Sequence, residues 1–364
     1  MTKLHDLCRQ HGQSPWLDNL KRGWITSGEL ERWVERGVRG ITSNPTIFQK
    51  AIAAGADYDD QFGDLVSGGT SVDDAYWDLV VTDIEDALRI LRPVHDDMPV
   101  DGFVSVELAP ELARDTDGSI AAARDLHERI AEPNLFVKIP ATSEGVPAIR
   151  QMVAEGRNIN VTLIFSLERY VDVMEAYLAG LESYDGDLSK VHSVASFFVS
   201  RVDTEVDRRL EAVGTDEALA LRGRAAVAQA KLAYQSFLST FSGERWDALA
   251  ARGGRVQRPL WASTSTKNPA LPDTLYVDEL IGPDTVNTMP EATLDAFIDH
   301  GRLARTVDRG VDEAAATLDR LGEVGVDVAD VGRVLEEEGV ASFAKSFDEL
   351  MTTLGDKADR LRNG

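Results

Sequence analysis

The stretch Asn134–Phe165, NLFVKIPATSEGVPAIRQMVAEGRNINVTLIF, contains the pattern that decides the fold. Its two ends, Asn134–Pro140 and Asn158–Phe165, are short apolar runs and are predicted to be strands. Between them, Gly145–Glu155 has the apolar spacing of an amphipathic helix. A strand, a helix and a second strand in this order are typical of a parallel sheet whose strands are joined by crossover helices.

The same alternation extends through the rest of the chain. Further strands are predicted at Ser14–Leu17, Arg39–Ser43, Asp101–Glu107, Val191–Val199, Arg258–Thr264 and Asp284–Met289. Helical patterns lie between strands, among them Gly118–Ala131, Leu167–Leu181 and Ser200–Thr240. Eight strands that alternate with helices predict a closed (β/α)8 TIM-type barrel. A doubly wound open sheet is the alternative, because periodicity alone does not establish closure.

Two longer helical regions are expected to elaborate this barrel. Pro45–Val100 is mostly helical and separates the second strand from the third. Glu291–Gly364 is too long for one barrel helix, so part of it is expected to pack over a barrel end. Because no linker or repeat divides the chain, residues 1–364 are expected to form a single barrel domain with a helical C-terminal extension from about residue 291.

Charge and composition exclude several classes of function. The chain has 62 acidic residues against 38 Lys and Arg, a net charge of −24. A nucleic-acid partner needs a basic surface, and anionic lipid would be repelled, so neither nucleic acid nor membrane is expected as a partner. The N-terminus lacks the apolar core of a signal peptide, and Cys8 is the only cysteine, so we expect a cytoplasmic protein.

The histidines show no metal-ligand spacing, and neither a Walker loop nor a GxGxxG motif is present. We therefore expect no metal and no organic cofactor. The sequence leaves open whether the protein is a monomer or a homodimer.

The position of polar residues within the strands is the main functional signal, since successive side chains of a strand point to opposite faces. One set is entirely apolar and is expected to face the covering helices: Val104, Val106, Val137, Ile139, Ile159, Val161, Leu163 and Phe165. The mixed set is expected to face the barrel interior: Phe103, Ser105, Glu107, Phe136, Lys138, Asn160, Thr162 and Ile164. Polar groups from neighbouring strands thus converge on one cavity near the strand ends, where barrel enzymes place their chemistry.

Lys138 and Glu107 are the chemically informative members of the inward set. A desolvated lysine amine can attack a carbonyl, and a nearby carboxyl can move protons while an imine forms and breaks. Taken singly, Lys138 could be a snorkelling side chain and Glu107 a helix cap. The two together favour a functional site, because ionised groups inside a barrel are costly unless they are paired or solvated.

Five segments in this order resemble the transaldolase family. They are GITSNPTIF (Gly40–Phe48), LFVKIPAT (Leu135–Thr142), INVTLIFS (Ile159–Ser166), SFFVSRVD (Ser196–Asp203) and LWASTSTKNP (Leu260–Pro269). The resemblance runs from about Trp16 to Met289 and is to the longer bacterial branch of the family. The similar fructose-6-phosphate aldolases are much shorter chains.

The resemblance implies four catalytic residues. Lys138 matches the lysine that forms the Schiff base, and Glu107 matches the glutamate that acts as acid and base through a water molecule. Thr162 resembles the threonine that helps to hold this water. Asp18 matches the aspartate that takes the proton from the C4 hydroxyl of the substrate.

The resemblance also implies a set of substrate-binding residues. Asn44 and Asn160 look like the asparagines that bind substrate hydroxyls, and Ser196 and Phe198 match a pocket serine and aromatic. Three residues match the phosphate site: Arg201, Ser265 and Lys267. Lys267 departs from the family, where many members have an arginine, and a lysine lacks the bidentate fork of a guanidinium.

Other interpretations of these residues remain open at this point. Asp18 could cap a helix, and Asn44 stands in a turn-like Ser-Asn-Pro-Thr sequence. Arg201 could pair with Asp203 or Glu205 on the helix that follows.

The family implies transfer of a dihydroxyacetone unit in the pentose phosphate pathway. The donor would be sedoheptulose 7-phosphate or fructose 6-phosphate, and the acceptor erythrose 4-phosphate or glyceraldehyde 3-phosphate. A lyase that releases free dihydroxyacetone and a non-catalytic sugar-phosphate-binding barrel are the alternatives.

Overall fold

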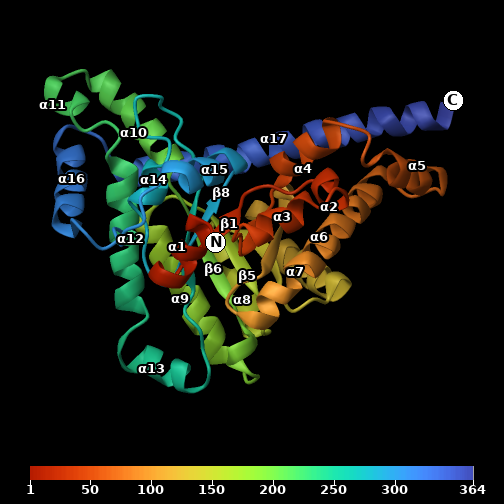
Figure 1. Ribbon diagram of the computed structural model, residues 1–364, viewed down its shortest axis with the longest axis horizontal. Coiled ribbons are helices and arrows are strands. Elements are labelled where there is room, and N and C mark those ends of the chain that lie inside the picture. The colour runs from red at the N-terminus through yellow and green to blue at the C-terminus, as the bar shows by residue number, and fades with distance from the viewer. Residues whose placement is uncertain (364) are drawn as a thin grey trace.

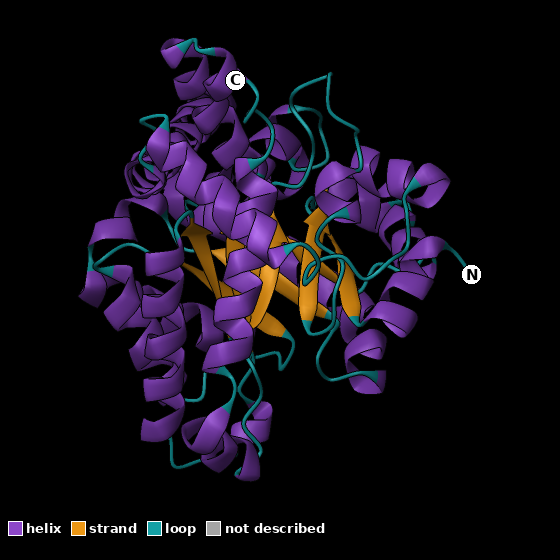
Figure 2. Ribbon diagram, turned by 90° about the vertical axis from the view of Figure 1, so that its left-hand side faces the viewer, coloured by secondary structure: helices purple, strands orange, loops and turns teal. Residues whose placement is uncertain are grey.

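The computed structural model of the protein describes residues 1–363, with a closed barrel of eight parallel strands at its centre (Figure 2). Each strand pairs with the next in sequence, and the last pairs with the first. The strands are β1 Gln13–Leu17, β2 Gly40–Thr42, β3 Phe103–Glu107, β4 Leu135–Pro140, β5 Ile159–Ile164, β6 Ser193–Phe198, β7 Arg258–Ala262 and β8 Thr285–Met289. The predicted barrel is confirmed, every strand lies within two residues of its predicted bounds, and the open-sheet alternative is wrong.

Helices surround the barrel and connect its strands (Figures 1 and 2). Those before β3 are α1 Lys3–His11, α2 Arg22–Thr26, α3 Glu29–Glu35, α4 Pro45–Ala53, α5 Asp59–Ser67 and α6 Val72–Asp97. Those between β3 and β6 are η1 Pro110–Arg114, α7 Thr116–Ile130, α8 Gly145–Ala154, α9 Leu167–Ser183 and η2 Leu188–Lys190. The expected helical insertion between β2 and β3 is thus confirmed as α4, α5 and α6.

The predicted helical stretch Ser200–Thr240 is broken and forms three helices. They are α10 Ser200–Val213, α11 Asp216–Leu219 and α12 Ala225–Thr240. Gly214 and Gly223 stand at the two breaks with φ of 73° and 68°. Glycine adopts this left-handed conformation without the steric penalty of a Cβ, and it ends a helix.

The C-terminal region is helical, as expected, and α17 lies across one end of the barrel (Figure 1). The helices from β6 onward are completed by α13 Gly243–Ala251, α14 Leu275–Asp278, α15 Glu291–His300, α16 Val311–Glu323 and α17 Val328–Asn363. The last of these packs against α4, α5, α6, α10 and the end of β5.

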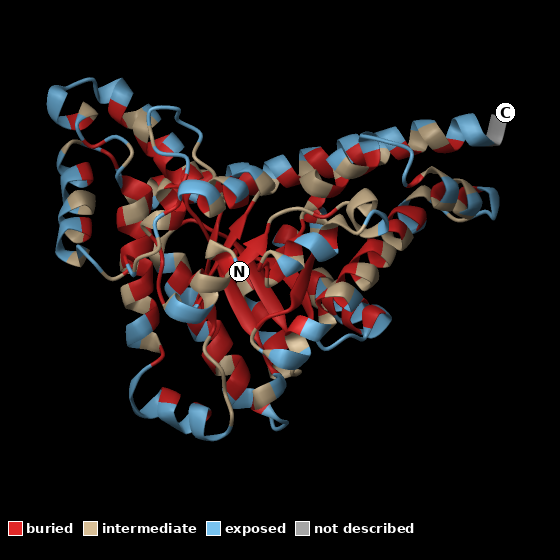
Figure 3. Cartoon of the chain, in the orientation of Figure 1, coloured by how far each residue is buried: buried red, intermediate tan, exposed pale blue. Residues whose placement is uncertain are grey.

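The interior of the barrel is filled with aromatic rings at the N-terminal ends of the strands. Phe103 and Phe136 stack with ring centroids 4.2 Å apart, and Trp16 lies 6.1 Å from Phe136. Gly40 of β2 makes room for the indole, since a Cβ there would lie 2.4 Å from the Trp16 ring. The strands are buried along their length (Figure 3). These rings close the bottom of the space at the C-terminal ends of the strands, and Phe103 and Phe136 also line a second cavity at the N-terminal face of the barrel.

The predicted inward and outward faces hold for most of the strands but are wrong for the end of β5. The pairing of β5 with β6 shifts register between Val161 and Ile164, and Leu163 has a φ of 60°. Such a bulge reverses the alternation of side chains. Leu163 and Phe165, expected on the outer face, instead lie against Gly339 of α17, and Ile164 is paired in register with Phe197.

Candidate functional site

A cavity of about 670 Å³ opens at the C-terminal ends of the strands. Nine of the eleven predicted site residues line it: Asp18, Asn44, Lys138, Thr162, Ser196, Phe198, Arg201, Ser265 and Lys267. The other two, Glu107 and Asn160, are buried beside and below it. The barrel therefore gathers residues from seven strands or the loops that follow them, because parallel strands all end at the same face.

Lys138 and Glu107 form a buried pair in the barrel interior. They are register partners on β4 and β3, which places their side chains next to each other on the inner face. Lys138 Nζ donates to Glu107 Oε2 at 2.7 Å and to the backbone oxygen of Ser43 at 2.9 Å. Their side chains are 6% and 3% exposed. The amine thus reaches the cavity while its partners hold it in one orientation.

The carboxyl groups of the site are shifted toward neutrality by burial. Burial raises the pKa of the Glu107 carboxyl, and the charge and hydrogen bond of Lys138 offset only part of this rise. Burial also raises the pKa of Asp18, against the hydrogen bond from Thr42 and the charge of Lys138, which lower it. A carboxyl with a raised pKa can give and take a proton closer to neutral pH than an ordinary one.

Asp18 follows β1 directly and is held by a short chain of hydroxyl groups. Thr42 Oγ1 donates to Asp18 Oδ1 at 2.7 Å, and Thr42 Oγ1 lies 2.6 Å from Thr288 Oγ1. Asp18 begins no helix, because the next helix starts at Arg22 after Lys21. The helix-cap interpretation is therefore wrong, and Asp18 lines the cavity from the end of β1, three strands away from β4.

Asn160 lies beneath the cavity and does not line it. Its Nδ2 donates to Ser105 Oγ at 3.0 Å, and its Oδ1 accepts from Ser196 Oγ at 2.7 Å. The residue is fully buried. This placement gives no support to the expected contact with substrate hydroxyls. It makes Asn160 a bridge across the barrel that orients Ser196, which does line the cavity.

Thr162 and Asn44 present polar groups to the cavity in different ways. Thr162 Oγ1 is buried and has no hydrogen-bond partner within residues 1–363, so it can bind a water or a substrate group. Asn44 caps α4, since its Oδ1 accepts from the Ile47 amide at 3.0 Å. Asn44 is therefore a helix N-cap and not a turn residue, and its Nδ2 remains available to the cavity.

Arg201 is free of the ion pairs that its sequence neighbours suggested. Glu205 accepts instead from Arg208 and Arg209, and Asp203 accepts from the Tyr276 hydroxyl and the Ala226 amide. Within the described part of the chain, no acidic side chain lies within ion-pair distance of Arg201. Its guanidinium lies 5.4 Å from the Phe198 ring centroid, and burial lowers its pKa.

Lys267 and Ser265 lie in the loop after β7, the strand next to β6, which leads into Arg201. Lys267 Nζ donates to Ser265 Oγ at 2.7 Å, and both residues line the cavity with Arg201. The cavity wall carries five cationic side chains, Lys21, Lys50, Lys138, Arg201 and Lys267, against the acids Asp18, Asp57 and Glu291. A positive lining in a chain of net charge −24 suits an anionic ligand.

Several lining residues were not predicted from the sequence. Ser342, Phe343 and Ser346 of α17 and Lys50 of α4 form part of the wall. Lys50 could have been found from the segment Gly40–Phe48, because α4 begins within this segment and carries Lys50 to the cavity wall. No feature of the sequence marked the α17 residues as part of the cavity wall, because no strand pattern extends into the C-terminal region.

Two further observations bear on cofactors and membranes. Among residues 1–363, no group of three or more His, Cys, Asp or Glu side chains could hold a metal ion. No helix in the described range is long and apolar enough to cross a membrane.

Comparison with known proteins extends over nearly the whole chain. The family model described as "Transaldolase/Fructose-6-phosphate aldolase" matches residues 15–354. A "Transaldolase" of Thermobifida fusca is 54% identical over 346 residues, which cover 93% of this chain and 94% of the relative. A "Transaldolase" of Parafrankia sp. is 52% identical, with 94% and 95% covered. A "Transaldolase" of Arthrobacter sp. is 51% identical, with 93% of each chain covered.

Proposed function

The chain belongs to the transaldolase/fructose-6-phosphate aldolase family, and on that premise we propose that it works as a transaldolase through a lysine Schiff base. It is a transferase of aldehyde or ketone residues. The unit transferred is dihydroxyacetone. The donor is sedoheptulose 7-phosphate or fructose 6-phosphate, and the acceptor is erythrose 4-phosphate or glyceraldehyde 3-phosphate.

One observation carries this proposal: a buried lysine amine reaches the cavity 2.7 Å from a buried carboxyl whose pKa is raised. Lys138 Nζ attacks the C2 carbonyl of the ketose phosphate and forms a C–N bond. Glu107 supplies the proton with which the C2 oxygen leaves as water, and an iminium results. The unpartnered hydroxyl of Thr162 supports a water that relays protons between Glu107 and the substrate.

Asp18, which lines the same cavity, is the base of the cleavage step in this proposal. As the base, its carboxylate takes the proton from the C4 hydroxyl, the C3–C4 bond breaks, and its electron pair moves toward the iminium nitrogen. An aldose phosphate leaves, and the three-carbon fragment stays on Lys138 as an enamine. An incoming aldose phosphate takes up the fragment by the reverse of these steps.

The remaining lining residues suit the binding of a phosphorylated sugar. Arg201, Ser265 and Lys267 together provide two cations and a hydroxyl at one rim, where a phosphate would bind. Asn44, Ser196 and Phe198 line the same cavity and would contact the hydroxyl groups and the carbon chain of the sugar. This activity belongs to the pentose phosphate pathway, and we place it in the cytoplasm.

Trapping of the imine tests the proposal. Borohydride added together with fructose 6-phosphate should inactivate the enzyme and leave a reduced three-carbon adduct on Lys138, which peptide mass spectrometry would locate. Lys138→Arg should abolish both activity and adduct, because a guanidinium does not act as a nucleophile at neutral pH. An adduct on another residue, or none, would overturn the mechanism and favour a non-catalytic binding protein.

A further inference from the structure

The roof of the cavity comes from the far end of the chain. Ser342, Phe343 and Ser346 of α17 line the cavity together with Thr46 and Lys50 of α4. Thr46 Oγ1 donates to Ser346 Oγ at 2.8 Å, which joins the two helices along the wall. Phe343 is 6% exposed, so its ring is enclosed between the helix and the cavity. A large apolar side chain thus contributes to the wall of a cavity that polar and apolar groups line together, with Phe198 as the other aromatic residue.

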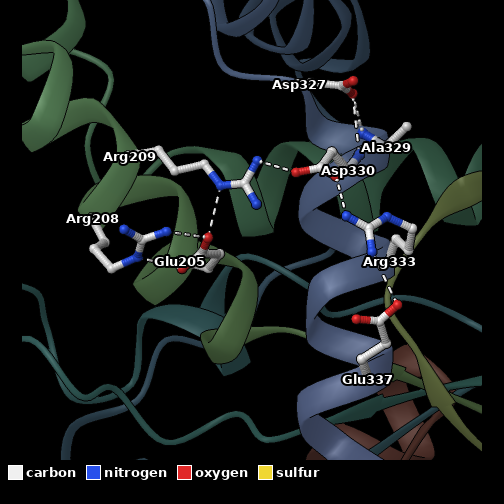
Figure 4. A network of polar contacts seen from close by, with 8 residues as sticks. All are labelled: Glu205, Arg208, Arg209, Asp327, Ala329, Asp330, Arg333 and Glu337. Atoms are coloured by element: carbon white, nitrogen blue, oxygen red, sulfur yellow. Dashed lines mark hydrogen bonds and ion pairs between the residues drawn. The ribbon is translucent and has the colours of Figure 1, made fainter.

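The N-terminal part of α17 is tied to α10 by a network of ion pairs (Figure 4). Arg209 of α10 donates to Glu205 at 2.7 Å and to Asp330 of α17 at 2.8 Å, and Arg333 donates back to Asp330 at 2.7 Å. The same α10 carries Arg201 at its start. Arg201, at the proposed phosphate site, and α17, at the roof of the cavity, are therefore both attached to α10.

The rest of α17 is held by close packing. A Cβ on Gly332 would lie 2.9 Å from the Ser166 Cβ, so the helix approaches the end of β5 as closely as a glycine allows. Farther along, Leu350 and Leu354 are buried, and Lys357 pairs with Asp59 of α5. Because anchors lie on both sides of Phe343, this ring is held in place and does not depend on a bound ligand for its position.

We propose that Phe343 is a specificity-determining residue, which directs the enamine on Lys138 toward a sugar acceptor by keeping water out of the roof of the cavity. This inference rests on the proposed function, because it concerns the fate of the enamine. It assigns the preference for transfer over simple cleavage to a residue of α17, which lies outside the strand motifs of the barrel.

The reaction that Phe343 suppresses is hydrolysis of the enzyme-bound fragment. A proton from water adds to C3 of the enamine, whose electron pair forms the new C–H bond, and the nitrogen becomes an iminium. Hydroxide then adds to C2, the C2–N bond breaks, and free dihydroxyacetone leaves while the Lys138 amine is restored. One water is consumed in all. Excluding water from a closed site prevents this kind of side reaction.

Phe343→Ala tests the inference, because it opens room for several water molecules in the roof without touching Lys138 or the phosphate rim. With fructose 6-phosphate alone, this variant should release free dihydroxyacetone about tenfold faster relative to its rate of transfer to erythrose 4-phosphate. Phe343→Leu keeps an apolar side chain, so its ratio of dihydroxyacetone release to transfer should lie between those of Phe343→Ala and the wild type. Borohydride trapping at Lys138 should be unchanged in all three proteins.

Leu354→Ala is the matched control, since it removes a buried apolar side chain from the same helix away from the cavity. It should lose stability on thermal unfolding and keep the wild-type ratio of release to transfer. An unchanged ratio in Phe343→Ala, or an equal rise in Leu354→Ala, would overturn the role of Phe343. If the wild type forms no adduct at Lys138, the proposed function itself fails, and the trapping result distinguishes that outcome.

Discussion

Replacing Arg201 with alanine should weaken the binding of phosphorylated sugars and leave unphosphorylated sugars almost unaffected. Arg201 is a partly buried guanidinium without an acidic partner in the described structure, so its charge is available for a ligand phosphate. A charge-assisted hydrogen bond contributes about 1.5–3 kcal/mol. Since about 1.4 kcal/mol corresponds to a factor of ten, KM for fructose 6-phosphate should rise by about ten- to a hundredfold.

The stability of this variant should not fall. Burial lowers the pKa of Arg201, so its unpaired charge opposes folding, and Arg201→Ala should keep or raise Tm. Arg208→Ala is the matched control on the same helix, because Arg208 is paired with Glu205 and does not line the cavity. It should leave both KM values unchanged.

Steady-state kinetics with fructose and with fructose 6-phosphate would check the prediction on both variants. Lys267→Ala should act in the same direction as Arg201→Ala, and Lys267→Arg should be tolerated, because a guanidinium keeps the positive charge and can bind phosphate with two hydrogen bonds. An equal loss of kcat/KM on both sugars, together with a lower Tm, would refute the reasoning. Arg201 would then be a structural residue, and the phosphate would bind elsewhere.

Three more predictions follow from the geometry. Glu107→Gln should slow imine formation, whereas Asp18→Asn should still form the imine but cleave the C3–C4 bond slowly. Rapid-quench trapping of the imine would measure the two steps separately, and a variant that slows both steps would contradict the separate roles assigned to Glu107 and Asp18. Burial raises the pKa of Asp203 to about 6, so its folded form keeps a proton that the unfolded chain has lost, and stability should fall by on the order of 3 kcal/mol as pH rises from about 4 to 6. Urea unfolding at several pH values should show a smaller fall in Asp203→Asn than in the wild type, since the raised pKa values of Asp18 and Glu107 act in both proteins; equal pH profiles would contradict it. Prolonged EDTA treatment should leave activity intact, since in the proposed mechanism the iminium is the electron sink; loss of activity on chelation, with recovery on adding zinc, would point to a metal-dependent aldolase.

Activity should also decline on the acid side earlier than an ordinary aspartate would allow. In the proposed mechanism Asp18 is a base and must be ionised, and its raised pKa moves its protonation toward neutral pH.

The sequence by itself determined the barrel and the inward pair of Lys138 and Glu107. Both follow from local rules: side chains alternate along a strand, and parallel strands joined by helices end at one face. Neighbouring strands then place the two residues in register, as β3 and β4 show. No long-range packing has to be known for this step, which is why the strand bounds were predicted to within two residues.

Only the tertiary structure decided which polar groups reach the cavity and which residues of the C-terminal region cover it. Asn160 and Ser196 both point inward, yet Asn160 lies below the cavity, because depth inside a barrel depends on how its strands are staggered. The bulge at Leu163 turns the end of β5 toward α17. Thr46 and Ser346 meet across 300 positions of sequence. Helix periodicity shows that α17 has a buried face, but the partner of that face is set by packing between elements that local sequence does not encode.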